Sequence, residues 1–118
     1  MSPTQALEAS ASQTYILMSP RKLRRVVNEI RGKRAGQAHQ ILQLMPYTAA
    51  RVVLKKLREA MFNAQVKYDV QDANQLVVSE VFVDEGPAYK RFKPRAQGRI
   101  YRRERPTSHI TLRVKVVK

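Results

Sequence analysis

Apolar residues recur at the spacing of an α-helix in three stretches of the sequence. The first covers residues 19–33, where Ser19 and Pro20 suit the start of a helix. The second covers residues 36–45, and the third, which is the longest, runs from about Thr48 to Lys67. The residues expected to face a core are Leu23, Val26, Val27 and Ile30 in the first helix, Ala38, Ile41, Leu42 and Met45 in the second, and Val53, Leu54, Leu57, Met61 and Ala64 in the third.

Three other stretches have the composition or the alternation of β-strands. Residues 14–18 form a short run of β-branched and aromatic side chains. Residues 76–87 and 109–118 alternate with a period close to two. In the second strand, the sequence predicts Val77, Val81 and Val83 on one face and Leu76, Val78 and Phe82 on the other; in the third, it predicts Ile110, Leu112, Val114 and Val116 on one face. The predicted fold class is therefore α+β.

Residues 86–109 connect the last two strands and show no apolar period of a further helix. The simplest connection is a β-hairpin arm whose limbs continue the strands, with a turn over residues 94–99. Gly98 can adopt a positive φ at such a turn without a steric penalty. The arm would be about 30 Å long at about 3.3 Å per residue. An isolated hairpin is marginally stable in water, so we expect an anionic partner to order this one.

The chain is long enough for one domain with a modest core, expected over residues 13–118. Residues 1–12 lack the features of a signal or transit peptide and are expected to form a disordered tail. No apolar run approaches the length of a membrane span, and there is no cysteine to form a disulfide or a thiolate metal site.

Charge adds the strongest indication of function. Twenty-three basic residues stand against nine acidic ones, a net charge of +14 with a pI near 10.8. Such self-repulsion disfavours a compact chain unless a polyanion relieves it, and the usual polyanion is nucleic acid. Two clusters, residues 21–34 and 90–105, hold most of the excess. The candidate RNA-binding residues are Arg21, Lys22, Arg24, Arg25, Arg31, Lys33 and Arg34 in the first cluster, and Lys90, Arg91, Phe92, Lys93, Arg95, Arg99, Tyr101, Arg102, Arg103 and Arg105 in the second.

Aromatic residues lie among the arm cations, and they could stack on bases or pack across the hairpin; the sequence leaves both open. No zinc ligands, RNA-recognition aromatic motif or KH glycine loop is present. A long basic arm on a small body suits a folded RNA with crevices better than a regular duplex, although composition alone does not separate RNA from DNA.

Other classes of function are weaker. Glu80, Asp84 and Glu85 are the single acidic cluster, but adjacent positions on a strand point to opposite faces, so Asp84 and Glu85 do not readily share an active site. His39 and His109 lack the spacing of metal ligands. We therefore expect no enzyme activity, no cofactor and no metal. A membrane-surface binder would need an exposed apolar stripe beside the cations, and folding should bury the stripe of the first helix.

Five strings carry a resemblance to a known family: "SPRKLRRVVNEIRGK" (19–33), "NAQ" (63–65), "VFVDEGP" (81–87), "KRFKPRAQGR" (90–99) and "TSHIT" (107–111). The chain resembles the family of bacterial-type large ribosomal subunit protein twenty-two over about residues 13–117. Pro106 and the pair Ile100–Tyr101 depart from the family pattern, and these departures concern local contacts of the returning limb.

The resemblance implies a three-stranded antiparallel sheet packed on three helices, with a long extended β-hairpin. It implies a structural role in the large subunit, with 23S-type rRNA as ligand, contacts to several rRNA domains and a part in early assembly. The implied partners are neighbouring ribosomal proteins, including protein four, and the nascent polypeptide, with no membrane and no homo-oligomer; the implied location is the ribosome of a bacterial cytoplasm or plastid stroma. The implied tunnel-lining residues are Lys90, Arg91, Lys93, Pro94, Arg95, Ala96, Gln97, Gly98 and Arg99.

Overall fold

The computed structural model describes residues 8–70, 72–94 and 100–116, with the backbone course of residues 89–94 and 100–105. Strand β1 (Glu8–Ile16) is followed by helices α1 (Pro20–Val27), α2 (Ala35–Leu44) and α3 (Thr48–Tyr68). A short 3-10 turn η1 (Ala73–Gln75) leads into β2 (Leu76–Glu85). The chain then forms β3 (Tyr89–Pro94) and β4 (Ile100–Arg105) and ends in β5 (Ser108–Val116).

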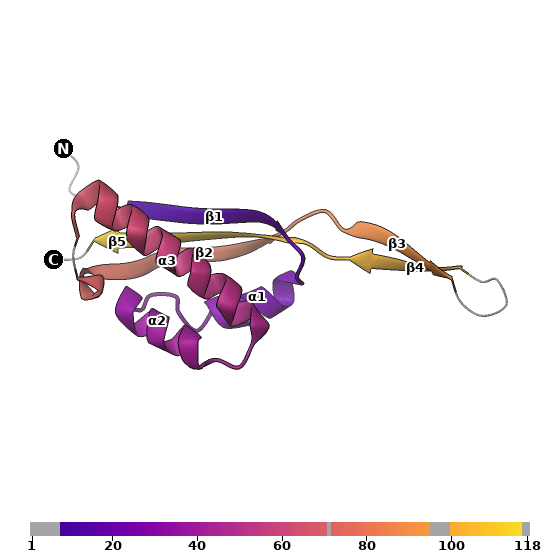
Figure 1. Cartoon of the computed structure of the whole chain (residues 1–118), viewed down its shortest axis with the longest axis horizontal. Coiled ribbons are helices and arrows are strands. Elements are labelled where there is room, and N and C mark those ends of the chain that lie inside the picture. Colours follow the sequence, from indigo (N-terminus) through magenta and orange to yellow (C-terminus); the bar gives the residue numbers. More distant parts are fainter. Residues whose placement is uncertain (1–7, 71, 95–99, 117–118) are drawn as a thin grey trace.

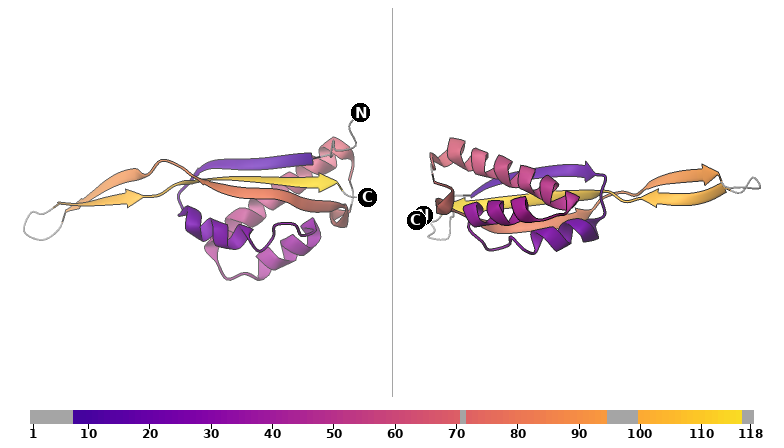
Figure 2. Two further views of the ribbon diagram at one scale, coloured as in Figure 1. Left: turned by 180° about the vertical axis from the view of Figure 1, so that it is seen from behind. Right: turned by 60° about the horizontal axis from the view of Figure 1, so that its bottom comes forward.

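Strands β1, β5 and β2 form an antiparallel sheet in the order β1-β5-β2, and the three helices cover one of its faces (Figure 1). Strands β3 and β4 pair with each other in a separate two-stranded sheet that projects from one end of the body (Figures 1 and 2). The molecule is correspondingly elongated, with extents of 66 × 33 × 21 Å. The predicted α+β fold, with three helices, a three-stranded antiparallel sheet and a hairpin arm, is confirmed.

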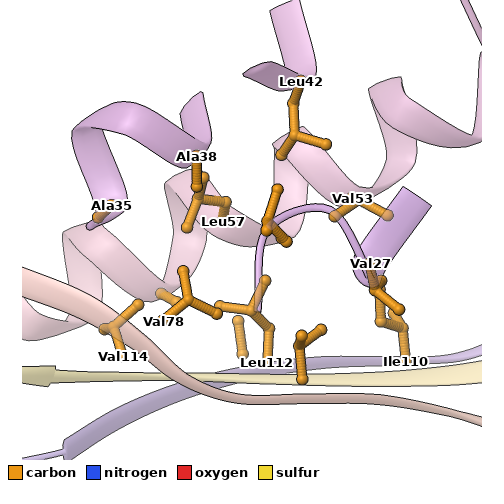
Figure 3. Close-up of a cluster of buried hydrophobic side chains, with 14 of the residues drawn as sticks. Val27, Ala35, Ala38, Leu42, Val53, Leu57, Val78, Ile110, Leu112 and Val114 are labelled. Carbon is orange, nitrogen blue, oxygen red and sulfur yellow. The ribbon is translucent and has the colours of Figure 1, made fainter. Parts of the chain in front are cut away.

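The core lies between the helices and the sheet (Figure 3). Val27 of α1, Leu42 of α2 and Leu57 of α3 converge on Leu112 and Ile110 of the central strand. Fully burying an aliphatic side chain of this size contributes about 1.5–3 kcal/mol. The helical stripes predicted from the sequence are therefore the stripes that fold against the sheet, with Ile41, Met45, Leu54 and Met61 partly buried at the margin of the core.

The expected tail over residues 1–12 is wrong for residues 8–12, which form the first part of β1 and pair with β5 from Glu8↔Lys115 to Ser12↔Thr111. Helix α3 holds this strand from its free side: Asn63 Nδ2 donates to Ser10 O at 2.9 Å, and the Tyr68 hydroxyl donates to Glu8 O at 3.0 Å. Residues 1–7 lie outside the described residues.

The predicted facing of β2 is also corrected. A β-bulge at Ser79 shifts the register between Val78↔Val114 and Glu80↔Arg113. An extra residue in one strand reverses the side-chain alternation beyond it. Leu76 and Val78 therefore share the core face with Val81 and Val83.

The first predicted helix is shorter than expected and ends at Val27. Residues 28–30 continue as tight turns, in which Glu29 N donates to Val26 O and Ile30 N to Val27 O, so Ile30 is still buried. The chain then leaves the helical path because it pairs with β2: Gly32 N donates to Val78 O at 3.0 Å and Val78 N donates to Lys33 O at 2.9 Å.

Candidate nucleic-acid interface

Helix α1 separates apolar from basic residues. Pro20, Leu23, Val26 and Val27 are buried, whereas Arg21, Lys22, Arg24 and Arg25 are exposed at the surface. The buried residues fix the rotation of the helix, and this rotation directs the other side outward. Since no acidic residue lies in its first turn, the exposed side is a cationic surface.

Three arginines of the first basic cluster bind backbone carbonyls of the protein itself. Arg24 donates from Nε and Nη2 to Val83 O at 3.2 and 3.0 Å. Arg31 donates from Nη2 to Val81 O at 2.7 Å and from Nη1 to Asn28 Oδ1 at 2.8 Å. Arg34 Nη1 donates to Asn74 O at 2.6 Å.

The bonds to Val81 O and Val83 O lie along β2, which is an outer strand of the sheet, whereas Asn74 lies in η1 directly before that strand. Unpaired carbonyls at a sheet edge invite pairing with another chain, and a covering segment removes that hazard. Gly32 and Lys33 form main-chain hydrogen bonds with the carbonyl and the amide of Val78. Arg31 and Arg24 bind the carbonyl oxygens of Val81 and Val83. The three arginines thus have a structural role that the sequence does not reveal.

The remaining cations of the first cluster, Arg21, Lys22, Arg25 and Lys33, are not bound to an acidic side chain in the described part of the structure. The Arg25 guanidinium lies over the ring of Tyr47, 4.2 Å from its centroid. This cation–π contact holds Arg25 at the junction of α1 and α3.

The second cluster lies on the arm. Strand β3 pairs with β4 from Tyr89↔Arg105 to Pro94↔Ile100. The register sets Arg91 opposite Arg103, and like charges directly opposite each other destabilise a strand pair. The predicted turn and tip residues Arg95, Ala96, Gln97, Gly98 and Arg99 lie outside the described residues.

The root of the arm is held by a group of buried polar contacts. Gly86 N donates to Thr107 O at 2.9 Å, and the Thr107 hydroxyl donates to Pro87 O. The Ser108 hydroxyl donates to Met18 O at 2.6 Å. Both side chains are almost completely buried. These bonds tie both limbs of the arm to each other and to the segment that precedes α1.

His109 completes the root. Its Nδ1 accepts a hydrogen bond from Tyr15 N at 3.1 Å, and its ring meets the Tyr15 ring edge to face, with centroids 5.1 Å apart. Tyr15 has a φ of 56°, an uncommon value for a residue with a side chain. It lies where the β1–β5 register shifts, between Gln13 and Ile16. The "TSHIT" string therefore folds as the junction between the body and the arm.

A third group of cations was not predicted from the sequence. Arg51, Lys55 and Arg58 are exposed on α3, and Arg58 Nε donates to His39 Nε2 at 3.3 Å. Their spacing of four and three residues places them on one side of the helix, which is a signal that the sequence does contain.

The acidic residues do not form a catalytic cluster. Glu80 pairs with Arg113 at 2.7 Å, and Asp84 and Glu85 occupy successive exposed positions at the end of β2. Among the described residues, no group of three His, Cys, Asp or Glu side chains could hold a metal ion. None of the described helices is both long enough and apolar enough to cross a membrane.

Comparison with known proteins agrees with this architecture. The family model of ribosomal protein L22p/L17e matches residues 11–115. The large ribosomal subunit protein uL22 of Acaryochloris marina is 50% identical over 106 residues, which are 90% of this chain and 88% of that protein. The uL22 protein of Clostridium novyi is 48% identical over 92% of this chain and 97% of its own length. The uL22c protein of Cyanophora paradoxa is 46% identical over 92% of this chain and 95% of its own.

The family is a structural and non-enzymatic component of the ribosome, which confirms the prediction that the chain is not an enzyme. The match spans the body and the arm alike, from within β1 to the last residue but one of β5. The chain belongs to the ribosomal protein L22p/L17e family.

Proposed function

We propose that this protein binds 23S-type rRNA of the large subunit through two basic surfaces, the outward side of α1 and the arm. The main observation behind the proposal is that the four cations of α1 do not have the same surroundings. Arg24 is bound to the protein backbone, whereas Arg21, Lys22 and Arg25 face outward beside an apolar side that is fully used in the core. Folding therefore does not consume these three charges, and they suit phosphate oxygens.

The arm supplies the second surface. Residues 90–105 contain eight basic residues and one acid, and the register brings two arginines opposite each other. A polyanion around the arm offsets this repulsion, so binding and ordering of the arm are coupled. In keeping with the family resemblance, the arm reaches inward through rRNA, lines the peptide exit tunnel beside protein four and contacts the passing nascent polypeptide.

The body and the arm then have different roles in the subunit. The body docks on rRNA near the tunnel exit, and the arm joins rRNA domains that lie deeper, which supports early assembly. Arg24 and Arg31 hold α1 and the segment after it on β2, and Arg34 holds the same segment on η1, so that the neighbouring cations keep their positions. The ribosome concerned is that of a bacterial cytoplasm or a plastid stroma.

The salt dependence of rRNA binding tests the α1 surface. Each phosphate contact contributes about 0.7–0.9 to the slope of log K against log salt concentration. The double variant Arg21→Gln/Lys22→Gln should lower the slope for transcribed large-subunit rRNA by about 1.4–1.8. The control Lys67→Gln/Lys115→Gln removes the same charge from exposed positions elsewhere and should leave the slope unchanged. An unchanged slope in the α1 variant would mean that this surface is only solvated.

A cross-linking experiment tests the tunnel role. Because the chain has no cysteine, an introduced cysteine is the single thiol of this protein that can be labelled. A single Ala96→Cys variant carrying a photo-crosslinker should react with a stalled nascent chain in assembled ribosomes. Ser12→Cys, on the exposed side of β1, should not react. Equal reaction from both positions, or none from the arm, would contradict the proposal.

A further inference from the structure

The outward side of α3 forms a single stripe along most of the helix. Arg51, Lys55, Arg58, Phe62 and Val66 are all exposed and follow one another at four, three, four and four residues. With 3.6 residues per turn, these positions fall within a sector of about 80°. The buried residues Val53, Leu57, Ala60 and Ala64 lie on the opposite side of the helix. The helix therefore shows its core side to the sheet and this stripe to the surroundings.

The charge of the stripe is uncompensated. Residues 48–68 contain five basic residues and one acid, Glu59. Glu59 is bound to the largely buried Lys56, 2.7 Å from its Nζ, and so does not neutralise the outward cations. Arg58 donates its Nε to His39 of α2 at 3.3 Å, and the side chain is exposed.

The stripe begins next to α1. Tyr47 directly precedes α3 and lies one helical turn before Arg51, and its ring carries the Arg25 guanidinium of α1 at 4.2 Å. The Arg25–Tyr47 contact thus brings the cationic side of α1 to the start of the α3 stripe, and no salt bridge to an acidic side chain is found for Arg21, Lys22, Arg25, Arg51, Lys55 or Arg58 among the described residues. A nucleic-acid backbone that extends beyond α1 would meet the next cations on α3.

We infer that α3 is a second rRNA-binding surface, on which Arg51, Lys55 and Arg58 bind phosphates and Phe62 packs against an exposed base or ribose. This inference rests on the proposed function, because it extends the α1 surface to the same RNA. An RNA ligand fits better than a protein one, since three successive cations complement a polyanion and an exposed aromatic ring is a stacking surface for unpaired bases. Phe62 is 63% exposed, so its ring is accessible to such a ligand.

The first test compares three variants that each remove two positive charges. Arg51→Gln/Lys55→Gln should lower the salt slope of binding to transcribed large-subunit rRNA by about 1.4–1.8, as expected for two lost phosphate contacts. Lys67→Gln/Lys115→Gln is the control and should not lower it. If the α3 pair behaves as the control does while Arg21→Gln/Lys22→Gln loses slope, the inference is wrong and the proposed function stands. If the unaltered protein shows no salt-dependent binding at all, the proposed function itself is wrong.

A second test locates the RNA directly. Val66→Cys introduces one thiol at the end of the stripe, in a chain that has no other, for attachment of a hydroxyl-radical cleavage reagent. Cuts in the rRNA near this position are expected in the assembled complex, and the cysteine-free protein should give none. Ser12→Cys, on the exposed side of β1 and opposite in facing to the buried Ala11, should give a different set of cuts. The absence of cuts from Val66→Cys, or cuts identical to those from Ser12→Cys, would overturn the inference.

Discussion

Arg24 of α1 donates two hydrogen bonds to the carbonyl oxygen of Val83, from Nε at 3.2 Å and from Nη2 at 3.0 Å. This contact joins the basic helix to the edge strand that leads into the arm. Only a guanidinium offers two donors in this planar arrangement, whereas an ammonium acts as a compact point charge. The contact is therefore a structural use of a residue that the sequence groups with the RNA-binding cations.

Arg24→Lys separates these two uses of the side chain. It keeps the charge but loses the forked contact, so we expect the free energy of unfolding in urea to fall by about 1–2 kcal/mol. The salt slope of rRNA binding should stay within error of the original, because the net charge is the same. Arg21→Lys, at an exposed position of the same helix, should change neither quantity. If Arg24→Lys had the same free energy of unfolding as the original protein, the contact would contribute little to folding.

Gly86 is placed where a larger residue does not fit. A Cβ atom at this position would collide with Thr107 Oγ1 and would lie 3.1 Å from His109 Cε1. Gly86→Ala should therefore displace the root of the arm and destabilise the protein by about 1–3 kcal/mol. Amide chemical shifts of residues 107–109 report the displacement. Gly36→Ala is the matched control, because position 36 lies in α2 and its nearest neighbour is a side-chain atom at 3.1 Å. Equal stability of the two variants would argue against a close-packed root.

A substitution of Ser108 tests the hydrogen bonds of the root separately from its packing. Its hydroxyl donates to Met18 O at 2.6 Å and is fully buried. Ser108→Ala leaves that carbonyl without its donor, which should cost about 1–3 kcal/mol in the free energy of unfolding. Ser12→Ala, on the exposed side of β1, should cost little. Thermal unfolding of both variants makes the comparison, and similar melting temperatures would contradict a structural role for the Ser108 hydroxyl.

The arm should be dispensable for folding of the body. Strands β3 and β4 form their own sheet, and the core consists of residues from the helices, from β1, β2 and β5, and from the segments directly after α1 and α3. Replacement of residues 88–104 by Asn-Gly, a sequence that favours a tight hairpin, should leave unfolding cooperative. The shortened protein should bind rRNA more weakly but still through α1. Loss of cooperative unfolding on this deletion would show that the body depends on the arm.

Much of this fold could be predicted from the sequence because its helices and its last strand have clean periods. The early part of β1 could not, since Ala9, Ser10, Ala11 and Ser12 are all small and their alternation carries little hydrophobic contrast. The bulge at Ser79 could not be predicted either, because an apolar run with one extra residue still alternates on either side of that residue. Both features depend on pairing with β5, which is remote in the sequence.

The candidate site could be predicted only in part. The basic clusters are visible as charge, but an arginine that binds a carbonyl of β2 looks the same in the sequence as one that faces solvent. The cations of α3 were overlooked because acidic residues elsewhere, such as Glu8, Asp69 and Asp72, offset them in the total charge. Their four- and three-residue spacing is visible in the sequence, whereas the contact of Arg25 with Tyr47, one turn before Arg51, becomes evident only in three dimensions.

We expect RNA to hold this protein in the large ribosomal subunit. Sedimentation of a cell lysate before and after RNase treatment tests it most directly, with the protein followed by an antibody or a tag at its amino terminus. The protein should sediment with the large subunit in the untreated lysate and should move to slow fractions after the RNA is degraded. Sedimentation apart from the large subunit in the untreated lysate, or a position that RNase does not change, would contradict this account.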